Sequence, residues 1–241
     1  MHTYTLCSLL FETNSNYESN LQTLLGLIDK TPPKSLIVAS EVCLTGFDYE
    51  NFEDVNNFAT FAIEKIKKAS WDKIIILTII EKRDGEVFNM LKIFHNAQVV
   101  YERAKARLFR FGGEEKYFSE GNDEDIRIVE VDGIKIATLV CFELRFKDLW
   151  KKCEGADVIV VPSWWGALRT EHFKSLTQTL AIMNQCYVVA SDSRNKDCSK
   201  MSGIITPLGE VERNGNTPCL EVPYEEKEIL KMRRYMDVGI G

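Results

Sequence analysis

The chain changes from strand to helix within the stretch Ile134-Lys135-Ile136-Ala137-Thr138-Leu139-Val140-Cys141-Phe142-Glu143-Leu144-Arg145-Phe146. Its first half is an apolar run typical of a buried strand, and a short helix is predicted over Phe146 to Cys153. Asp132-Gly133 comes just before this run and predicts a hairpin with a strand over Ile126 to Val131. We therefore expect Cys141 at the end of a strand, just before a helix.

The same alternation of apolar runs and helical patterns continues on both sides of this stretch. Strands are expected over Thr5 to Phe11, Leu36 to Ala39, Ile74 to Ile80, Val158 to Val161 and Tyr187 to Ala190. Helices are expected after Asn16 and over Val55 to Ala69 and Arg169 to Asn184, with a helix-prone tail over Glu225 to Tyr235. Antiparallel hairpins are expected within Glu86 to Arg103 and Gly203 to Arg213. This order predicts an α/β fold, and the lack of a linker or repeat predicts a single domain over residues 1–241.

Composition excludes several classes of partner. The 241 residues include 30 basic and 36 acidic side chains, for a formal net charge of −6, and the basic residues are scattered. Such a chain has no electrostatic footprint for nucleic acid or for an anionic membrane. It also has no apolar run long enough to cross a bilayer and no signal peptide pattern at the N-terminus.

Seven cysteines are distributed along the chain, at Cys7, Cys43, Cys141, Cys153, Cys186, Cys198 and Cys219. Their number is odd and no CxxC pair occurs, so the spacing predicts neither a disulfide framework nor a zinc knuckle. Three scattered histidines add no metal constellation. We therefore expect reduced thiols in a cytoplasmic protein without a metal or other cofactor.

Three groups able to do acyl-transfer chemistry follow predicted strands. Glu41 ends the strand at Leu36 to Ser40, Lys105 lies beyond the strand that ends at Arg103, and Cys141 ends the strand described first. A thiol has a reference pKa of about 8.5, so it needs a base to act as a nucleophile at neutral pH. A carboxylate can supply that base and an ammonium can stabilise an oxyanion. For a single cysteine, a buried structural thiol is the simpler interpretation, and position alone does not decide between the two.

Six segments in order resemble the nitrilase, or carbon–nitrogen hydrolase, superfamily. They are Ile37 to Phe47, Lys105 to Phe109, Glu114 to Gly121, Val140 to Phe146, Gly155 to Ser163 and Gly203 to Gly209. The resemblance covers most of the chain. It implies a four-layer α-β-β-α sandwich of two mixed sheets flanked by helices, and a homodimer or higher homo-oligomer.

The resemblance also implies a role for each site residue. Cys141 is the implied nucleophile, Glu41 the general base and Lys105 the group that stabilises the oxyanion. Glu114 is the implied second carboxylate, which orients Lys105 and the substrate. Glu115 competes for that role, and we prefer Glu114 because its spacing to Gly121 matches the family.

The pocket is less defined by sequence than the catalytic residues. Phe142, Trp164 and Trp165 are candidate pocket residues, although a core role for the two tryptophans is equally favoured. Glu143 and Arg145 flank the cysteine and are candidates to bind substrate, but we expect both to tie the turn together. Five positions depart from the family pattern and leave the substrate open: Ser40, Arg107, Lys147, Leu180 and Met183.

These observations together predict a hydrolase that cleaves a small linear amide through a thioester on Cys141. An ω-amide, an aliphatic amide and an N-carbamoyl compound all stay open as substrates, and an amide is favoured over a nitrile. Two alternatives are a catalytically silent protein that binds a metabolite or a protein, and an acyltransferase that passes the thioester to an amine.

Overall fold

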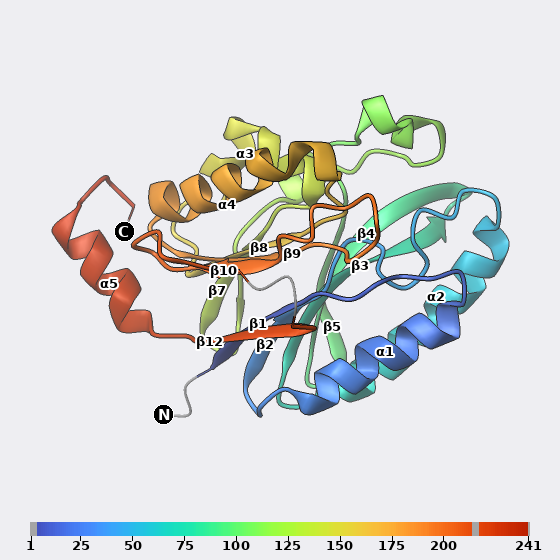
Figure 1. Cartoon of the computed structure of the whole chain (residues 1–241), viewed down its shortest axis with the longest axis horizontal. Coiled ribbons are helices and arrows are strands. Elements are labelled where there is room, and N and C mark those ends of the chain that lie inside the picture. Colours follow the sequence, from blue (N-terminus) through green and yellow to red (C-terminus); the bar gives the residue numbers. More distant parts are fainter. Residues whose placement is uncertain (1–3, 214–216, 241) are drawn as a thin grey trace.

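Two six-stranded mixed sheets pack against each other between outer layers of helices in the computed structural model (Figure 1), which describes residues 4–213 and 217–240. The first sheet has the order β12-β1-β2-β3-β4-β5 and the second the order β11-β10-β9-β8-β7-β6. The predicted sandwich of helix, sheet, sheet and helix layers is confirmed.

Three neighbouring strands of the first sheet run in the same direction. β1 (Thr5–Leu9), β2 (Ser35–Val38) and β3 (Ile74–Arg83) are parallel, whereas β4 (Glu86–His95) and β5 (Gln98–Ala104) continue as antiparallel hairpins. The helices α1 (Tyr17–Lys30) and α2 (Phe52–Ala69) make the two crossovers and lie side by side on the outer face (Figure 1). Asn16 caps α1, its side chain accepting a hydrogen bond from Ser19 N at 2.8 Å.

Alternation along the strands explains why this sheet is covered on both faces. Leu6, Leu36 and Ile76 belong to the core between the two sheets, whereas Cys7 and Ile37 pack in the core beneath α1 and α2. Successive side chains of a strand point to opposite faces, so a continuous apolar run serves both cores. The sequences of these strands are therefore largely continuous apolar runs, rich in Val, Ile and Leu.

The second sheet carries the stretch from which the sequence analysis began. β7 (Ile134–Thr138), β8 (Val158–Pro162) and β9 (Tyr187–Ser191) are parallel, and α3 (Lys147–Lys151) and α4 (Thr170–Asn184) cover them (Figure 1). Antiparallel strands extend both edges: β6 (Val129–Val131), β10 (Gly203–Ile205) and β11 (Val211–Arg213). β6 begins at Val129 and not at Ile126 as predicted, because Ile126 ends the 3₁₀ turn Asp123–Asp125.

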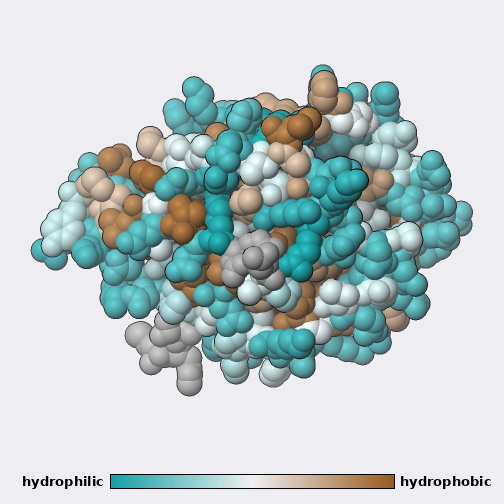
Figure 2. Space-filling view, in the orientation of Figure 1, coloured by the Kyte–Doolittle hydropathy of each residue, from teal (hydrophilic) through white to brown (hydrophobic). Residues whose placement is uncertain are grey.

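The chain then returns to the first sheet. β12 (Cys219–Pro223), which we did not predict, pairs antiparallel with β1, and α5 (Glu226–Tyr235) follows it. Exposed apolar side chains gather on and after α5, where Figure 2 shows brown surface: Leu230, Tyr235, Met236 and Val238. Within the described residues, no helix is both long and apolar enough to cross a membrane.

Candidate active site

The three predicted groups lie just beyond the ends of strands from both sheets. Glu41 follows β2, Lys105 follows β5 and Cys141 follows β7. Lys105 Nζ donates to Glu41 Oε1 at 2.7 Å, and the Cys141 thiol lies close enough to the Glu41 carboxyl to affect its pKa. The structure thus brings all three together at the boundary between the sheets.

Glu41 is fully buried and well supplied with donors. Besides Lys105, its Oε1 accepts from Asn89 Nδ2 at 2.8 Å, and its Oε2 accepts from the Trp164 backbone N–H at 3.2 Å. Burial raises the pKa of the Glu41 carboxyl, and the charge of Lys105 opposes that rise. A carboxylate with a raised pKa is a better proton acceptor, so Glu41 has the properties of a general base.

Glu114 is the second carboxylate of the cluster. Lys105 Nζ lies 2.9 Å from each of its carboxylate oxygens, and Glu114 Oε2 also accepts from the Phe109 backbone N–H at 3.0 Å. Glu115 is exposed, whereas Glu114 is buried against Lys105, which is the position expected of the second carboxylate. Although burial alone lowers the pKa of Lys105, the charges of Glu41 and Glu114 raise it above its ordinary value. Lys105 is therefore a fixed cation.

Cys141 occupies a strained turn. Its φ of 45° lies in the left-handed region, which a residue with a side chain adopts at a cost. The fully buried Glu143 holds this turn, because its carboxylate accepts from the Val140 N–H at 2.7 Å and from the Ala106 N–H at 2.6 Å. Arg103 pairs with the same carboxylate at 2.6 Å. The expectation that Glu143 is structural is confirmed.

The thiol of Cys141 is buried next to two carboxylates. Burial and the charge of Glu41 raise its pKa well above the ordinary value, and Lys105 opposes them. The raised pKa favours the protonated thiol over a preformed thiolate. Transfer of the thiol proton to Glu41 can accompany attack on a bound carbonyl carbon.

A small pocket opens at Cys141. The cavity itself is small, about 30 Å³, and its mouth opens to solvent, so it suits a small substrate. Its walls include Phe142, Trp164 and Trp165, the three residues predicted for the pocket. Phe109, Arg145, Gly166 and Arg169 complete the lining.

Two arginines give this pocket a positive wall. Arg145 stacks over Trp165, with its guanidinium carbon 4.8 Å from the ring centroid, and Arg169 lies 5.2 Å from the centroid of Phe109. Burial and the nearby charge of Arg169 lower the pKa of Arg145. Among the described residues, neither guanidinium forms an ion pair with a carboxylate. The wall therefore presents two cations that an anionic ligand can pair with.

Sequence reasoning named Arg145 as a possible substrate-binding residue but preferred a structural role for it, and it missed Arg169. We expected Arg145 to tie the turn together, but the turn is held by Glu143, and Arg145 faces the pocket and contacts His172 Nδ1 at 3.2 Å. Arg169 sits on the 3₁₀ turn Ala167–Arg169 before α4, far from Cys141 in sequence. The one sequence feature that pointed to Arg169 was its place in the short segment after Trp164-Trp165, which follows the carboxyl end of β8.

The five departures from the family pattern fall outside the catalytic contacts. Ser40 is buried and its hydroxyl has no hydrogen-bond partner, and Arg107 pairs with Asp123. Lys147 begins α3 on the surface. Leu180 is buried in the core between the sheets and α4, whereas Met183 is exposed.

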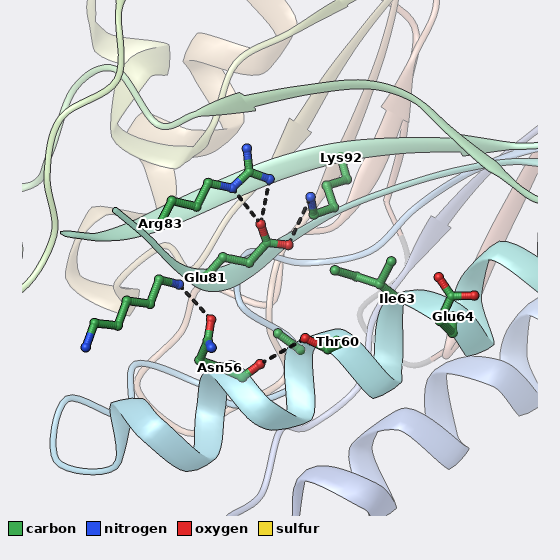
Figure 3. A pocket seen from close by; sticks show the side chains of 9 residues that line it. Asn56, Thr60, Ile63, Glu64, Glu81, Arg83 and Lys92 are labelled. Atoms are coloured by element: carbon green, nitrogen blue, oxygen red, sulfur yellow. Dashed lines mark hydrogen bonds and ion pairs between the residues drawn. The ribbon is translucent and has the colours of Figure 1, made fainter. Parts of the chain in front are cut away.

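A second cavity, of about 360 Å³, lies between α2 and the β3–β4 hairpin (Figure 3). Its charged side chains pair with one another: Lys92 lies 2.9 Å from Glu81, and Arg83 donates to Glu81 at 2.7 Å and to Glu102 at 2.7 Å. No cysteine, serine or histidine is among the residues that line it. The chemistry is therefore concentrated at Cys141.

Comparison with known proteins agrees with this arrangement. The model of the carbon-nitrogen hydrolase family matches residues 6–216. The chain is 29% identical over 191 residues to the 2-oxoglutaramate amidase of Bacillus subtilis, which covers 75% of this chain and 73% of that protein. It is 27% identical over 212 residues to the deaminated glutathione amidase of Escherichia coli O157:H7, covering 83% and 81%.

The fold agrees as well. The crystal structure of Saccharomyces cerevisiae Nit3, a member of the nitrilase superfamily, superposes with a TM-score of 0.86 at 20% identity and covers 98% of this chain and 95% of that one. The family match spans most of the chain and includes Glu41, Lys105, Glu114 and Cys141. This chain therefore belongs to the carbon–nitrogen hydrolase family of the nitrilase superfamily.

Proposed function

We propose that this protein hydrolyses a small linear amide that carries a carboxylate at its other end, an ω-amide acid, through a thioester on Cys141. The observation that carries the proposal is the pocket at Cys141. A buried base and a fixed cation lie beside the thiol there, and two arginines that pair with no carboxylate of the described residues form one wall. The base and cation support the reaction, and the arginines support the carboxylate.

The first half of the reaction forms the thioester. Cys141 Sγ attacks the amide carbon while Glu41 takes the thiol proton, and the Lys105 ammonium stabilises the negative oxygen that develops. Glu114 holds Lys105 in place through the two contacts at 2.9 Å. When the C–N bond breaks, Glu41 returns its proton to the leaving nitrogen, which departs as ammonia.

The second half releases the acid. A water attacks the thioester carbon, and Glu41 takes a proton from it. The C–S bond then breaks, the carboxylic acid leaves, and the sulfur regains its proton from Glu41. The cycle consumes water and an amide and needs no cofactor.

Substrate choice follows from the charge of the pocket. Arg145 and Arg169 lie at the same pocket as the nucleophile, and a guanidinium matches a carboxylate in a bidentate geometry. A linear acid with the amide at its far end can place its carboxylate on this wall and its carbonyl carbon at Cys141. The names of two relatives, a 2-oxoglutaramate amidase and a deaminated glutathione amidase, support the same class.

Ammonia release from matched amides tests the proposal. We expect kcat/KM for 2-oxoglutaramate and glutaramate to exceed that for pentanamide, which lacks the carboxylate, by about 10- to 100-fold, as charged hydrogen bonds predict. Intact mass after rapid acid quench should show an acyl group on the protein. Cys141→Ala should lose both the adduct and ammonia release, and Cys186→Ala, a buried cysteine outside the pocket, should retain both.

Three outcomes would count against the proposal. Equal rates for glutaramate and pentanamide would remove the carboxylate requirement, and absence of ammonia from every amide would favour a binding protein. Faster product formation on addition of an amine, with the amine found in the product, would show an acyltransferase.

A further inference from the structure

Two cysteines and a glutamate meet on the first sheet, far from Cys141. Cys7 lies on β1 and pairs with Glu221 of β12, and Cys219 precedes Glu221 by two residues. Side chains two apart on a strand share a face, and cross-strand partners share it too. The pairing of β1 with β12 therefore gathers the three side chains, although more than two hundred residues separate Cys7 from Cys219.

The three ligand atoms are close enough to share one metal ion. The sulfur atoms of Cys7 and Cys219 and a carboxylate oxygen of Glu221 lie within 4.8 Å of one another, and Cys219 Sγ lies 3.8 Å from Glu221 Oε1. Zinc bonds of about 2.3 Å to sulfur and 2.0–2.2 Å to oxygen place tetrahedral ligands about 3.5–3.8 Å apart. One pair already has that separation, and the others, at most 4.8 Å, would need to shorten by about 1 Å on binding.

The three residues differ in exposure, from a buried cysteine to a glutamate open to solvent, and the exposed side gives a metal ion access to the cluster. Cys7 is fully buried, Cys219 is half-buried and Glu221 is exposed. The Glu221 side of the cluster is open to solvent, so a water molecule can occupy the fourth coordination position of the metal. Lys73 is close enough to Cys7 for their charges to interact, and its Nζ is fixed by the carbonyls of Ile28 and Thr31 at 2.7 and 2.9 Å. That cation offsets the excess negative charge of two thiolates and a carboxylate around a divalent ion.

We propose that Cys7, Cys219 and Glu221 form a zinc site that joins β12 to β1. Thiolate ligands select zinc over magnesium and calcium, which prefer oxygen. β12 is the outer strand of its sheet, reached by a crossing from the second sheet. A metal bound by both strands stabilises this edge, because it binds only the folded pairing.

Cobalt titration tests this site directly. The experiment uses the full chain with Cys141→Ala, so that the nucleophile cannot bind metal, and a phosphine reductant to keep the thiols reduced. Co²⁺ should produce a thiolate-to-cobalt charge-transfer band and the visible bands of a tetrahedral ion, saturating at one equivalent. Zn²⁺ should displace Co²⁺ and so abolish the charge-transfer band and the visible bands. It should also raise the melting temperature of the same protein.

Variants show whether these residues are the ligands. In the Cys141→Ala background, Cys219→Ser should remove the charge-transfer band or weaken cobalt binding at least 100-fold, and Glu221→Gln should weaken it about 10-fold. Cys198→Ala, a buried cysteine outside the cluster, should leave the titration unchanged. Absence of a charge-transfer band in the Cys141→Ala protein, or an unchanged titration in Cys219→Ser, would overturn the proposal. Amide hydrolysis by the parent chain is measured separately, so failure of one proposal does not affect the other.

Discussion

Lys105 Nζ and Glu41 Oε1 lie 2.7 Å apart, and neither side chain has exposed surface. With Glu114 on its other side, Lys105 is a single buried cation between two carboxylates. Burying such a cluster costs more than an apolar core of the same volume, so stability alone does not account for it. The cluster fits a site in which a base and an oxyanion partner must be held in position before substrate arrives.

Replacing Glu41 by glutamine should remove the base while preserving the shape of the site. We expect kcat for the amide substrate to fall by about 10²- to 10⁴-fold, the usual contribution of a general base. Steady-state ammonia release measures this change. Glu81→Gln alters a carboxylate in the second cavity and should keep wild-type activity; a wild-type kcat in Glu41→Gln would contradict the assignment.

The dependence of kcat/KM on pH should report the ionisation of Glu41. Glu41 must be ionised to accept the thiol proton, so kcat/KM should fall as pH falls through its pKa. Burial raises that pKa above the ordinary value of 4.5, which moves the acid limb to higher pH. The residual activity of Glu41→Gln should lack this limb, and Glu81→Gln should retain it. An acid limb that persists in Glu41→Gln belongs to another group.

Lys105→Met should destabilise the fold as well as stop catalysis. Removing the cation leaves Glu41 and Glu114 buried without their partner, which costs about 3–5 kcal/mol of unfolding free energy for a broken buried pair. Urea unfolding measures the loss. Adding Glu114→Gln to Lys105→Met should recover part of it, because one stranded charge is then removed. Equal stability of wild type and Lys105→Met would show that the cluster is not ionised as described.

The pocket arginines should affect substrate binding more than the chemical step. Arg145→Met and Arg169→Met should each raise KM for an ω-amide acid by about 10- to 100-fold, as loss of a charged hydrogen bond predicts. Their effect on pentanamide, which has no carboxylate, should be small. Arg234→Met, on the exposed face of α5, is the matched control. A similar loss for both substrates would indicate that the arginines only maintain the shape of the pocket.

The sequence predicted the layers and the catalytic cluster because both depend on local patterns. Apolar runs of both sheets are long enough to identify strands, and Glu41, Lys105 and Cys141 each follow one of them. β12 was missed because it is an edge strand whose residues are only partly buried, so it has no strong alternation.

The arginine wall could not be predicted in the same way. Arg145 and Arg169 belong to different 3₁₀ turns, and only the packing of these turns around Trp165 brings both guanidinium groups to one pocket. The same limit applies to Cys7 and Cys219, whose spacing gave no metal signal and which meet only through the pairing of β1 with β12. The local periodicity of a sequence does not show which distant strands pair with each other.

Asp192 links the pocket to the stability of the fold. Its buried carboxylate follows β9 and accepts from the Trp165 backbone N–H at 2.8 Å, from Ser199 Oγ at 2.5 Å and from the Lys200 backbone N–H at 2.8 Å. Burial raises its pKa from 3.8 to about 6, against the effect of these donors. Trp165 lines the pocket, so the ionisation of Asp192 bears on the loop that shapes it.

Because the pKa of Asp192 is raised in the folded protein, the free energy of unfolding should depend on pH. The folded pKa is raised, so the contribution of Asp192 to stability is fully present below pH 3.8 and is lost as pH rises to about 6. A shift of two units corresponds to about 3 kcal/mol. Asp192→Asn does not titrate, so the unfolding free energy of wild type minus that of Asp192→Asn should fall by about this amount between pH 3 and pH 7. Urea unfolding of both proteins across this range measures the difference, and a difference independent of pH would show that Asp192 keeps an ordinary pKa.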